Sequence, residues 1–296
     1  SLKDNIMKKR SQKTDNQSFK SSSKEKLNKP HHQAKPAKPK NPYFYGIHAV
    51  SMLIKRRPEE VLGLFIQLRD DGQMSSEHQL IVQSAKHFGI SIQNAHRERL
   101  TELCGSQQHQ GVVALARTAP MADETILDNL LMQDDVLFLV LDQITDAHNL
   151  GACLRTACAM GVDAVILPRH QSAPITPTVA KVSVGASEVI PVISVTNLAR
   201  TLEKMKKSGV FIFGTALDKS AKPAFECDFG GKVAIIMGSE GDGMRRLTQT
   251  MCDTLVYIPM AEVLDRPQSL NVSVATGMVL YEVMRQRRGF GQMPLV

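Results

Sequence analysis

The sequence predicts an α/β protein whose C-terminal half is a parallel β-sheet with helices on both faces. Short runs rich in valine and isoleucine alternate there with stretches of helical spacing, and in order they are VLFLVLD, AVILP, VFIFGTA, VAIIMG and TLVYIP. Strands that are apolar along their whole length are typical of parallel sheets buried on both sides. Ligands of such sheets bind beyond the carboxyl ends of the strands, so we expect the functional site there.

A smaller α/β unit is predicted ahead of this sheet, from residue 43 to residue 116. Helical spacing is present at residues 45–57 and 77–88, and strand patterns at residues 61–68, 91–96 and 109–116. Residues 117–135 lose strand character and include Pro120, which predicts a linker with one short helix. The larger domain is then predicted to span residues 136–290.

The first 42 residues differ from the rest of the chain in charge. They hold 12 Lys and Arg against 3 Asp and Glu, whereas the remaining residues hold 24 basic and 26 acidic side chains. Because this segment has few apolar residues to bury, we expect a disordered basic tail. Such a tail binds nucleic-acid phosphates by releasing counterions, and a merely solubilising extension is the alternative.

Composition argues against several protein classes. No run of the chain approaches the roughly 20 apolar residues of a membrane-spanning helix, and no apolar core follows the N-terminal lysines as in a secretory signal. The five cysteines show no spacing typical of metal ligands. We therefore expect a cytoplasmic protein with no membrane association and no metal.

The segment DQITDAHNLG follows the first apolar run and opens a helix. Either Asp146 or Asn149 is placed to cap that helix, so a plain cap is one explanation of Asn149. Arg155 falls outside the apolar stripe of the helix, and packing therefore does not require a guanidinium there. A solvated surface arginine is the alternative to a functional one.

The segment GSEGDGM follows the run VAIIM and opens a further helix. Its glycines let backbone N–H groups approach a ligand closely. Their order is GxxGxG, which differs from the GxGxxG fingerprint of dinucleotide-binding proteins, and no acidic residue follows at the expected distance. A nicotinamide-dependent oxidoreductase is therefore disfavoured. Glu240 also has an ordinary explanation, since a carboxylate at a helix start complements the helix dipole.

The segment SLNVSVATGMVLYEVMRQR is predicted to be the C-terminal helix, with Ser269 as its cap. Asn271 falls in the first turn, among apolar residues, and its amide is costly to bury unless it is hydrogen-bonded. A fully paired, structural asparagine is the alternative to a catalytic one.

Taken together, TDAHNLGACLRTA, MGSEGDGMRRL, YIPM and SLNVSVATG closely resemble the signature motifs of the SpoU/TrmH branch of the SPOUT RNA methyltransferases. YGIHAV and HQGVVA resemble the substrate-binding domain of the bacterial 23S rRNA guanosine-2'-O-methyltransferases that act on the peptidyl-transferase loop. The resemblance implies a SPOUT domain with a trefoil knot, a rare feature among folds, preceded by an L30e-like RNA-binding unit. It also implies a homodimer with the C-terminal helix, roughly residues 270–287, in the interface.

The same resemblance implies that S-adenosyl-L-methionine is the cofactor. By motif position, Gly238, Ile258 and Leu270 are its expected contacts, mainly through the backbone. Gly214, at the end of the preceding strand, is a further candidate.

The resemblance further implies methyl transfer to the ribose 2'-OH of a guanosine in 23S rRNA, either free or in a large-subunit precursor. It places Arg155 beside that hydroxyl as the base, with Asn149 and Glu240 arranging it and Asn271 orienting the loop or the nucleotide. A guanidinium holds its proton far above neutral pH, so electrostatic stabilisation of the developing alkoxide is the alternative role of Arg155.

Two other hypotheses stay open within RNA biology. One is a 2'-O-methyltransferase of tRNA or of another rRNA nucleotide. The other is a non-catalytic RNA-binding factor of ribosome assembly, disfavoured because all four polar motif residues are present. One departure from the family concerns residues 261–268, AEVLDRPQ, where relatives have a short glycine- and serine-rich turn. This longer loop leaves the fine geometry of the cofactor site open, and Arg266 within it is a candidate for an RNA phosphate contact.

Overall fold

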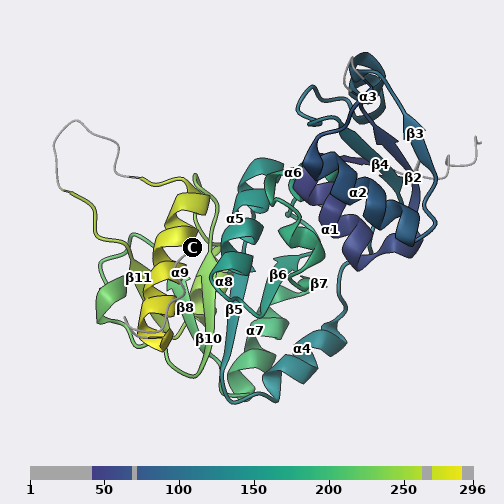
Figure 1. Ribbon diagram of the computed structural model, residues 1–296. Helices are drawn as coiled ribbons and strands as arrows, with labels where there is room; N and C mark the ends of the chain where they lie inside the picture. Colours follow the sequence, from purple (N-terminus) through teal and green to yellow (C-terminus); the bar gives the residue numbers. More distant parts are fainter. Residues whose placement is uncertain (1–41, 69–71, 262–268, 289–296) are drawn as a thin grey trace, which may run out of the picture. The chain divides into compact units, whose positions relative to one another are not determined.

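The computed structural model describes residues 42–68, 72–261 and 269–288 of the chain (Figure 1). The described residues belong to one compact unit that contains two separate β-sheets. Residues 1–41 of the predicted basic tail lie outside the described residues, as does most of the longer loop with Arg266.

The first sheet belongs to the small N-terminal unit and has the strand order β1-β4-β2-β3. Strand β4 pairs antiparallel with β1 and β2, while β2 and β3 are parallel. The strands are β1 (Tyr43–Tyr45), β2 (Val61–Ile66), β3 (Ile92–Asn94) and β4 (Val112–Ala116). The helices are α1 (Ile47–Arg56), α2 (Ser76–His87) and α3 (Arg97–Cys104). These strands and helices lie within residues 43–116, and β1 and α3 are elements that the sequence pattern did not indicate.

The second sheet has seven strands in the order β7-β6-β5-β10-β8-β11-β9, and every neighbouring pair is parallel. The strands are β5 (Val136–Leu141), β6 (Ala164–Pro168), β7 (Val192–Val195), β8 (Phe211–Thr215), β9 (Lys222–Pro223), β10 (Lys232–Met237) and β11 (Thr254–Tyr257). All five predicted runs form strands, so the predicted parallel α/β class is confirmed. Strands β7 and β9 were not predicted.

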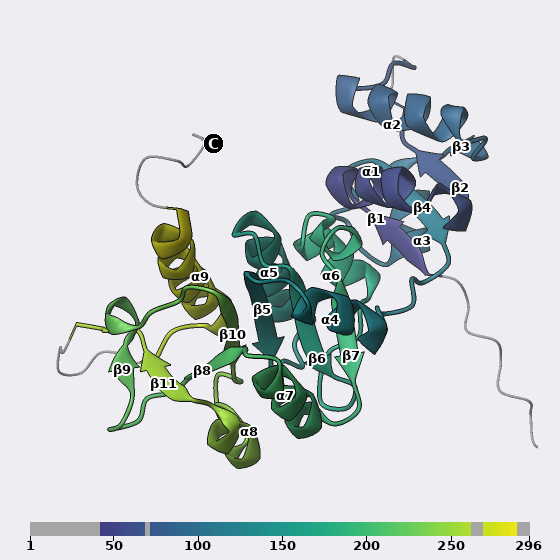
Figure 2. The same ribbon diagram turned by 90° about the horizontal axis from the view of Figure 1, so that it is seen from below.

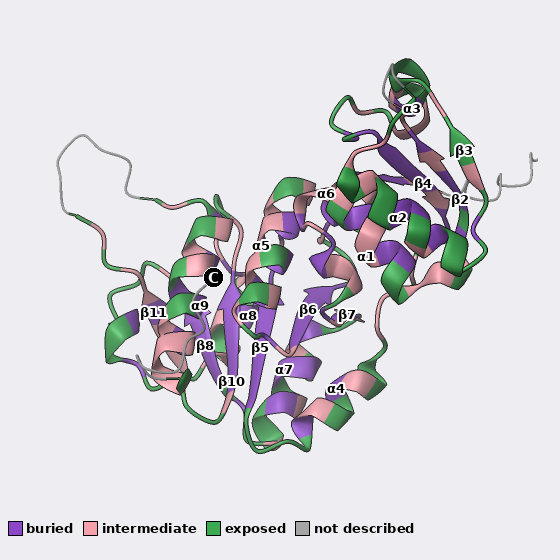
Figure 3. Ribbon diagram, viewed as in Figure 1, coloured by how far each residue is buried: buried purple, intermediate pink, exposed green. Residues whose placement is uncertain are grey.

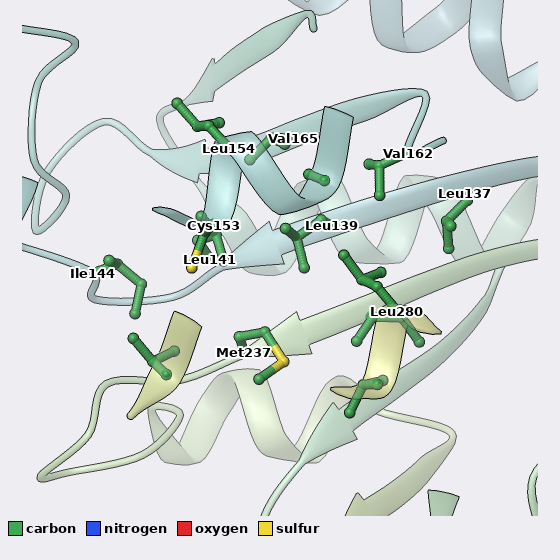
Figure 4. Close-up of a cluster of buried hydrophobic side chains, with 14 of the residues drawn as sticks. Leu137, Leu139, Leu141, Ile144, Cys153, Leu154, Val162, Val165, Met237 and Leu280 are labelled. Atoms are coloured by element: carbon green, nitrogen blue, oxygen red, sulfur yellow. The ribbon is translucent and has the colours of Figure 1, made fainter. Parts of the chain in front are cut away.

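Helices cover both faces of this sheet. Successive side chains of a strand point to opposite faces, so strands that are apolar at successive positions present an apolar surface on each face. In β5, Leu137, Leu139 and Leu141 pack in one layer with α5 (Ala147–Ala159) and α9 (Val272–Arg288), as Figure 4 shows. The intervening side chains of β5 pack in the other layer with α4 (Glu124–Leu131) and α7 (Leu198–Lys207). The two helical layers are visible in Figure 2, and the central strands β5, β6 and β10 between them are buried over most of their length (Figure 3). Two shorter helices are α6 (Pro177–Val182) and α8 (Arg246–Met251).

The order of the strands creates a switch point between β5 and β10. From β5 the chain continues to β6 and β7 on one side, then crosses to β8 on the other, and β10 later enters between β5 and β8. Leu141 of β5 pairs with Met237 of β10, so the two strands end side by side. Loops that leave a parallel sheet at such a point diverge and open a crevice for ligands. The trefoil knot and the L30e likeness stay predictions.

Candidate active site

Three of the four predicted catalytic residues are hydrogen-bonded to one another at this switch point. The Asn149 Nδ2 amide donates to Glu240 Oε1 over 3.3 Å, and the Asn271 Nδ2 amide donates to Asn149 Oδ1 over 3.0 Å. Asn271 Nδ2 also donates to Glu240 Oε1. The side chains come from α5, from the loop after β10 and from the residue before α9. The fold therefore brings the three together from distant parts of the sequence.

Asn149 is available to this cluster because another residue caps its helix. The Asp146 carboxylate accepts a hydrogen bond from the Asn149 backbone N–H over 2.8 Å and is the cap of α5. The interpretation of Asn149 as a plain helix cap is therefore wrong. Its side-chain amide is left to bond Glu240 and Asn271.

Glu240 lies on a tight hairpin rather than at the start of α8. Ser239 and Gly243 exchange two backbone hydrogen bonds of 3.0 Å, and α8 begins only at Arg246. The expectation that Glu240 complements the dipole of that helix is therefore wrong. Its Oε1 instead accepts the backbone N–H of Val272, the first residue of α9, over 3.2 Å. A carboxylate at this position favours the N-terminus of α9.

Asn271 immediately precedes α9 and is exposed to solvent in the single chain. Its Oδ1 accepts the backbone N–H of Ser273 over 2.9 Å, which satisfies a first-turn donor. Ser269, the expected cap, lies too far ahead of Val272 for that role. Asn271 was also expected to lie in the first turn among apolar residues. This expectation is wrong, because α9 starts one residue later, at Val272, and Asn271 is exposed.

Arg155 stands apart from the three bonded residues. Its side chain is exposed on α5 and forms no hydrogen bond or ion pair within the described parts of the chain. Helix side chains tilt toward the helix N-terminus, and the N-terminal end of α5 is the end that carries Asn149. The guanidinium is therefore available to a ligand at this end of the sheet.

An ion pair between a buried carboxylate and a partly exposed arginine, which the sequence pattern did not indicate, holds the loop that carries Glu240. Asp142, at the end of β5, is 0% exposed in its side chain. Its Oδ1 accepts Arg245 Nε over 2.8 Å and its Oδ2 accepts the Arg245 backbone N–H over 3.1 Å. Arg245 also donates to Gln171 over 2.9 Å. An acidic residue directly after an apolar strand was the available sequence signal, because a buried carboxylate requires a charged partner.

A pocket of about 470 Å³ opens beside Glu240, beyond the ends of β8, β10 and β11. Three of the four predicted cofactor contacts line it, namely Gly238, Ile258 and Leu270. Gly214 is not part of the lining. It lies behind the wall, where a Cβ would come within 2.7 Å of Cε of Met244, which does line the pocket. The other lining residues include Thr215, Ala216, Leu217, Asp218, Ser239, Asp242, Tyr257 and Ala275.

The backbone of the hairpin approaches residue 238 so closely that only a glycine fits there without a shift. A Cβ on this residue would lie 2.2 Å from the carbonyl carbon of Gly243 and 2.2 Å from the backbone nitrogen of Met244. The hairpin with Glu240 therefore folds directly onto Gly238, and the pocket wall at this point is backbone. Across the described residues, no three His, Cys, Asp or Glu side chains are grouped as metal ligands. No helix in those residues is long and apolar enough to cross a membrane.

Comparison with solved structures shows the same fold in known RNA-modifying enzymes. The SpoU methyltransferase AviRb from Streptomyces viridochromogenes, in complex with AdoMet, superimposes with a TM-score of 0.66 at 21% identity, over 83% of this chain and 90% of that one. A structure described as an RNA 2'-O ribose methyltransferase gives a TM-score of 0.66 at 24% identity, over 83% and 88% of the two chains.

Comparison of sequences extends this likeness to the family. The 23S rRNA (guanosine-2'-O-)-methyltransferase RlmB of Acinetobacter baylyi is 52% identical over 256 residues, which is 86% of this chain and 100% of that protein. The protein of the same name from Shewanella oneidensis is 46% identical over 84% of this chain and 99% of its own length. Residues 43–122 match the family described as RNA 2'-O ribose methyltransferase substrate binding. Residues 136–281 match the SpoU rRNA methylase family, and the chain belongs to that family.

Proposed function

We propose that this protein transfers a methyl group from S-adenosylmethionine to the ribose 2'-OH of a guanosine in 23S rRNA. The observation that carries the proposal is the bonded cluster of Asn149, Glu240 and Asn271, of which Glu240 lines the pocket. The sequence alignments with two relatives named for this activity cover 100% and 99% of the length of those relatives. All five cysteines are unpaired, which agrees with action in the reducing cytoplasm.

The pocket suits the cofactor in size and in chemistry. Its volume of about 470 Å³ falls within the range of small-molecule sites. Ile258 and Leu270 offer apolar contacts to an adenosine group, and the backbone at Gly238 permits close approach. Asp218 and Glu240 add negative charge that complements a cationic ligand. S-adenosylmethionine supplies a methyl group that is already activated on its sulfonium.

Arg155 and the three residues of the cluster then have distinct tasks. A ribose hydroxyl is a weak nucleophile until its proton is lost to water, and the developing alkoxide needs a positive charge beside it. We assign this charge to Arg155, because a guanidinium keeps its proton and stabilises an anion more readily than it removes a proton. Asn149 and Asn271 orient the nucleotide, and Glu240 fixes both amides through its Oε1.

Replacing Glu240 with glutamine should lower methyl transfer by about 10-fold to 100-fold, since misplaced orienting groups cost rates of this order. Oε1 accepts N–H groups from Asn149, Asn271 and Val272, and no amide presents the charged acceptor that three donors share. Single-turnover transfer rates would measure the effect. Glu226→Gln, the same change at an exposed glutamate that lies outside the pocket and bonds neither asparagine, is the matched control. Equal rates in Glu240→Gln and wild type would contradict the assigned role.

We also propose that the protein is a homodimer through α9. Val274, Met278 and Tyr281 form an apolar stripe that is 45–51% exposed, while the opposite stripe of the helix packs on the sheet. Exposed apolar stripes of this kind mark association surfaces. The stripe flanks Gly277, where α9 lies against Thr156, the neighbour of Arg155 on α5, so a partner seated there would approach Arg155.

The double variant Met278→Asp/Tyr281→Asp should therefore be monomeric, because two carboxylates cannot be buried unpaired between apolar surfaces. Size-exclusion chromatography with light scattering would measure the mass. Leu80→Asp, at an exposed leucine of α2, is the control and should leave the mass unchanged. A double variant that keeps the wild-type dimer mass would rule out this face as the interface.

The proposed activity is tested by methyl transfer in vitro and in cells. Purified protein with labelled S-adenosylmethionine should label unmodified 23S rRNA, and 16S rRNA and tRNA serve as competing substrates. Mapping of ribose methylation in cells with and without the protein would locate the nucleotide. Labelling confined to tRNA would show that tRNA, and not 23S rRNA, is the substrate. No labelling of any RNA would support a non-catalytic factor instead.

A further inference from the structure

A second cavity, of about 410 Å³, lies in the small N-terminal unit and is lined almost entirely by polar, uncharged or basic side chains. It is bounded by the residues after β2, by the start of α2 and α3, and by the loop of residues 107–111. Among the residues that the structure describes, its lining contains no Asp or Glu. A negatively charged polymer such as RNA would therefore meet no repelling carboxylate among these lining residues.

The loop of residues 107–111 is held in place by a buried histidine. His109 is 1% exposed, and its Nδ1 accepts the Gly111 backbone N–H over 3.0 Å. Its Nε2 hydrogen then donates to Thr101 Oγ1 over 3.2 Å, and the Thr101 hydroxyl donates to the Arg97 carbonyl over 3.1 Å. Burial, followed by the charge of Arg97, lowers the pKa of His109 and keeps the imidazole neutral. The first turn of α3 and the loop thus form one bonded structure.

The backbone of this loop is also strained. Gln110 has a φ of 55°, a left-handed conformation that is costly for a residue with a side chain. Its carbonyl is bonded to His78 Nε2 over 2.8 Å, and its side-chain oxygen accepts the Ile47 backbone N–H over 3.2 Å. At Gly111 a Cβ would come within 2.7 Å of the His78 ring. Strain of this kind persists where the surrounding structure enforces it, and it concentrates at binding sites.

Four polar side chains of the cavity have no partner among the described residues. The amides of Gln67, Gln107 and Gln108 and the guanidinium of Arg97 form no hydrogen bond or ion pair with other described residues, and all four line the cavity. A glutamine amide presents donors and an acceptor together, as the edge of a nucleobase does. Arginine and histidine planes stack on bases that are splayed out of a single strand. Several unpaired amides with a cation match a base better than a bare phosphate.

We propose that this cavity binds an unpaired base of the RNA substrate and so selects the RNA segment that is methylated. The inference rests on the proposed function, because it takes RNA to be the substrate of the chain. It assigns base recognition to Gln107 and Gln108 and stacking or phosphate contact to Arg97. None of these residues belongs to the methyl-transfer site.

The double variant Gln107→Ala/Gln108→Ala of the full chain tests the assignment. The KM for 23S rRNA should rise by about 10-fold or more, as expected for the loss of a base contact, while kcat and the cofactor affinity stay unchanged. The salt dependence of RNA binding should keep its slope, since no phosphate contact is lost. Gln93→Ala, at an exposed glutamine of β3 outside the cavity, is the matched control. Both variants alter exposed residues, and equal melting temperatures would confirm that they fold.

A second arm uses single-stranded hexaribonucleotides of A, C, G or U, with binding to the full chain followed by fluorescence anisotropy. Wild type should discriminate among the four sequences, and the double variant should bind them equally. An unchanged KM for rRNA, or a wild type that binds all four hexamers alike, would overturn the proposal. A lower salt slope in the double variant would overturn it in favour of phosphate binding. A wild type that discriminates among hexamers but methylates no rRNA would instead defeat the proposed function.

Discussion

Replacing Arg155 with alanine should reduce methyl transfer by about 10²-fold to 10³-fold, the usual loss when one charge-stabilising donor is removed from an active site. Affinity for S-adenosylmethionine should stay unchanged, because Arg155 does not line the pocket and bonds no described residue. The folded state should also keep its stability, since the side chain is exposed. Single-turnover rates with saturating rRNA, together with calorimetric titration of the cofactor, measure both quantities.

Two further variants sharpen this result. Arg155→Lys keeps the charge but loses the planar guanidinium, so partial activity would support charge stabilisation of the alkoxide. Arg200→Ala removes an exposed arginine of α7, on the other face of the sheet from α5, and should transfer methyl groups at the wild-type rate. Wild-type turnover in Arg155→Ala would remove this residue from the mechanism altogether.

The strands of the large sheet could be predicted because each is apolar over most of its length. The elements that escaped prediction lack this signal. Strand β9 has two residues, and β7 has four that become a strand by pairing with β6. Helix α3 buries a single residue, Leu100, so its sequence shows almost no amphipathic period. Their structure is determined by distant partners rather than by local pattern.

The candidate site also has features that could be predicted from the sequence and features that could not. Its residue types and its location at strand ends could be predicted, and the resemblance grouped Asn149, Glu240 and Asn271 before any geometry was known. The helix starts near Glu240 and Asn271 could not be predicted. The bond at the start of α9, for example, joins Val272 to Glu240, 32 positions away. The Asp142–Arg245 pair spans 103 positions. Hydrogen bonds of this range follow from the strand order, which no local period encodes.

Replacing Gly238 with alanine should strongly weaken cofactor binding and destabilise the fold by about 1–3 kcal/mol, as overpacking generally does. The new Cβ would meet the backbone of Gly243 and Met244 at 2.2 Å, and backbone cannot rotate aside as a side chain can. Urea unfolding and calorimetric titration of S-adenosylmethionine would measure the two effects. Cofactor binding at wild-type strength would show that the hairpin can move without cost.

Gly241→Ala provides the control, because it lies on the same hairpin and a Cβ there would have no neighbouring atom within 4 Å. It should change stability by less than about 0.5 kcal/mol, as is usual for surface substitutions. The comparison also separates two roles of the hairpin. In Gly238→Ala the displaced backbone carries Glu240 away from Asn149 and Asn271, so transfer should stay low even when the cofactor concentration is raised. Recovery of the full rate at high cofactor concentration would mean that Gly238 serves the pocket alone, and that the asparagines keep their orientation without Glu240.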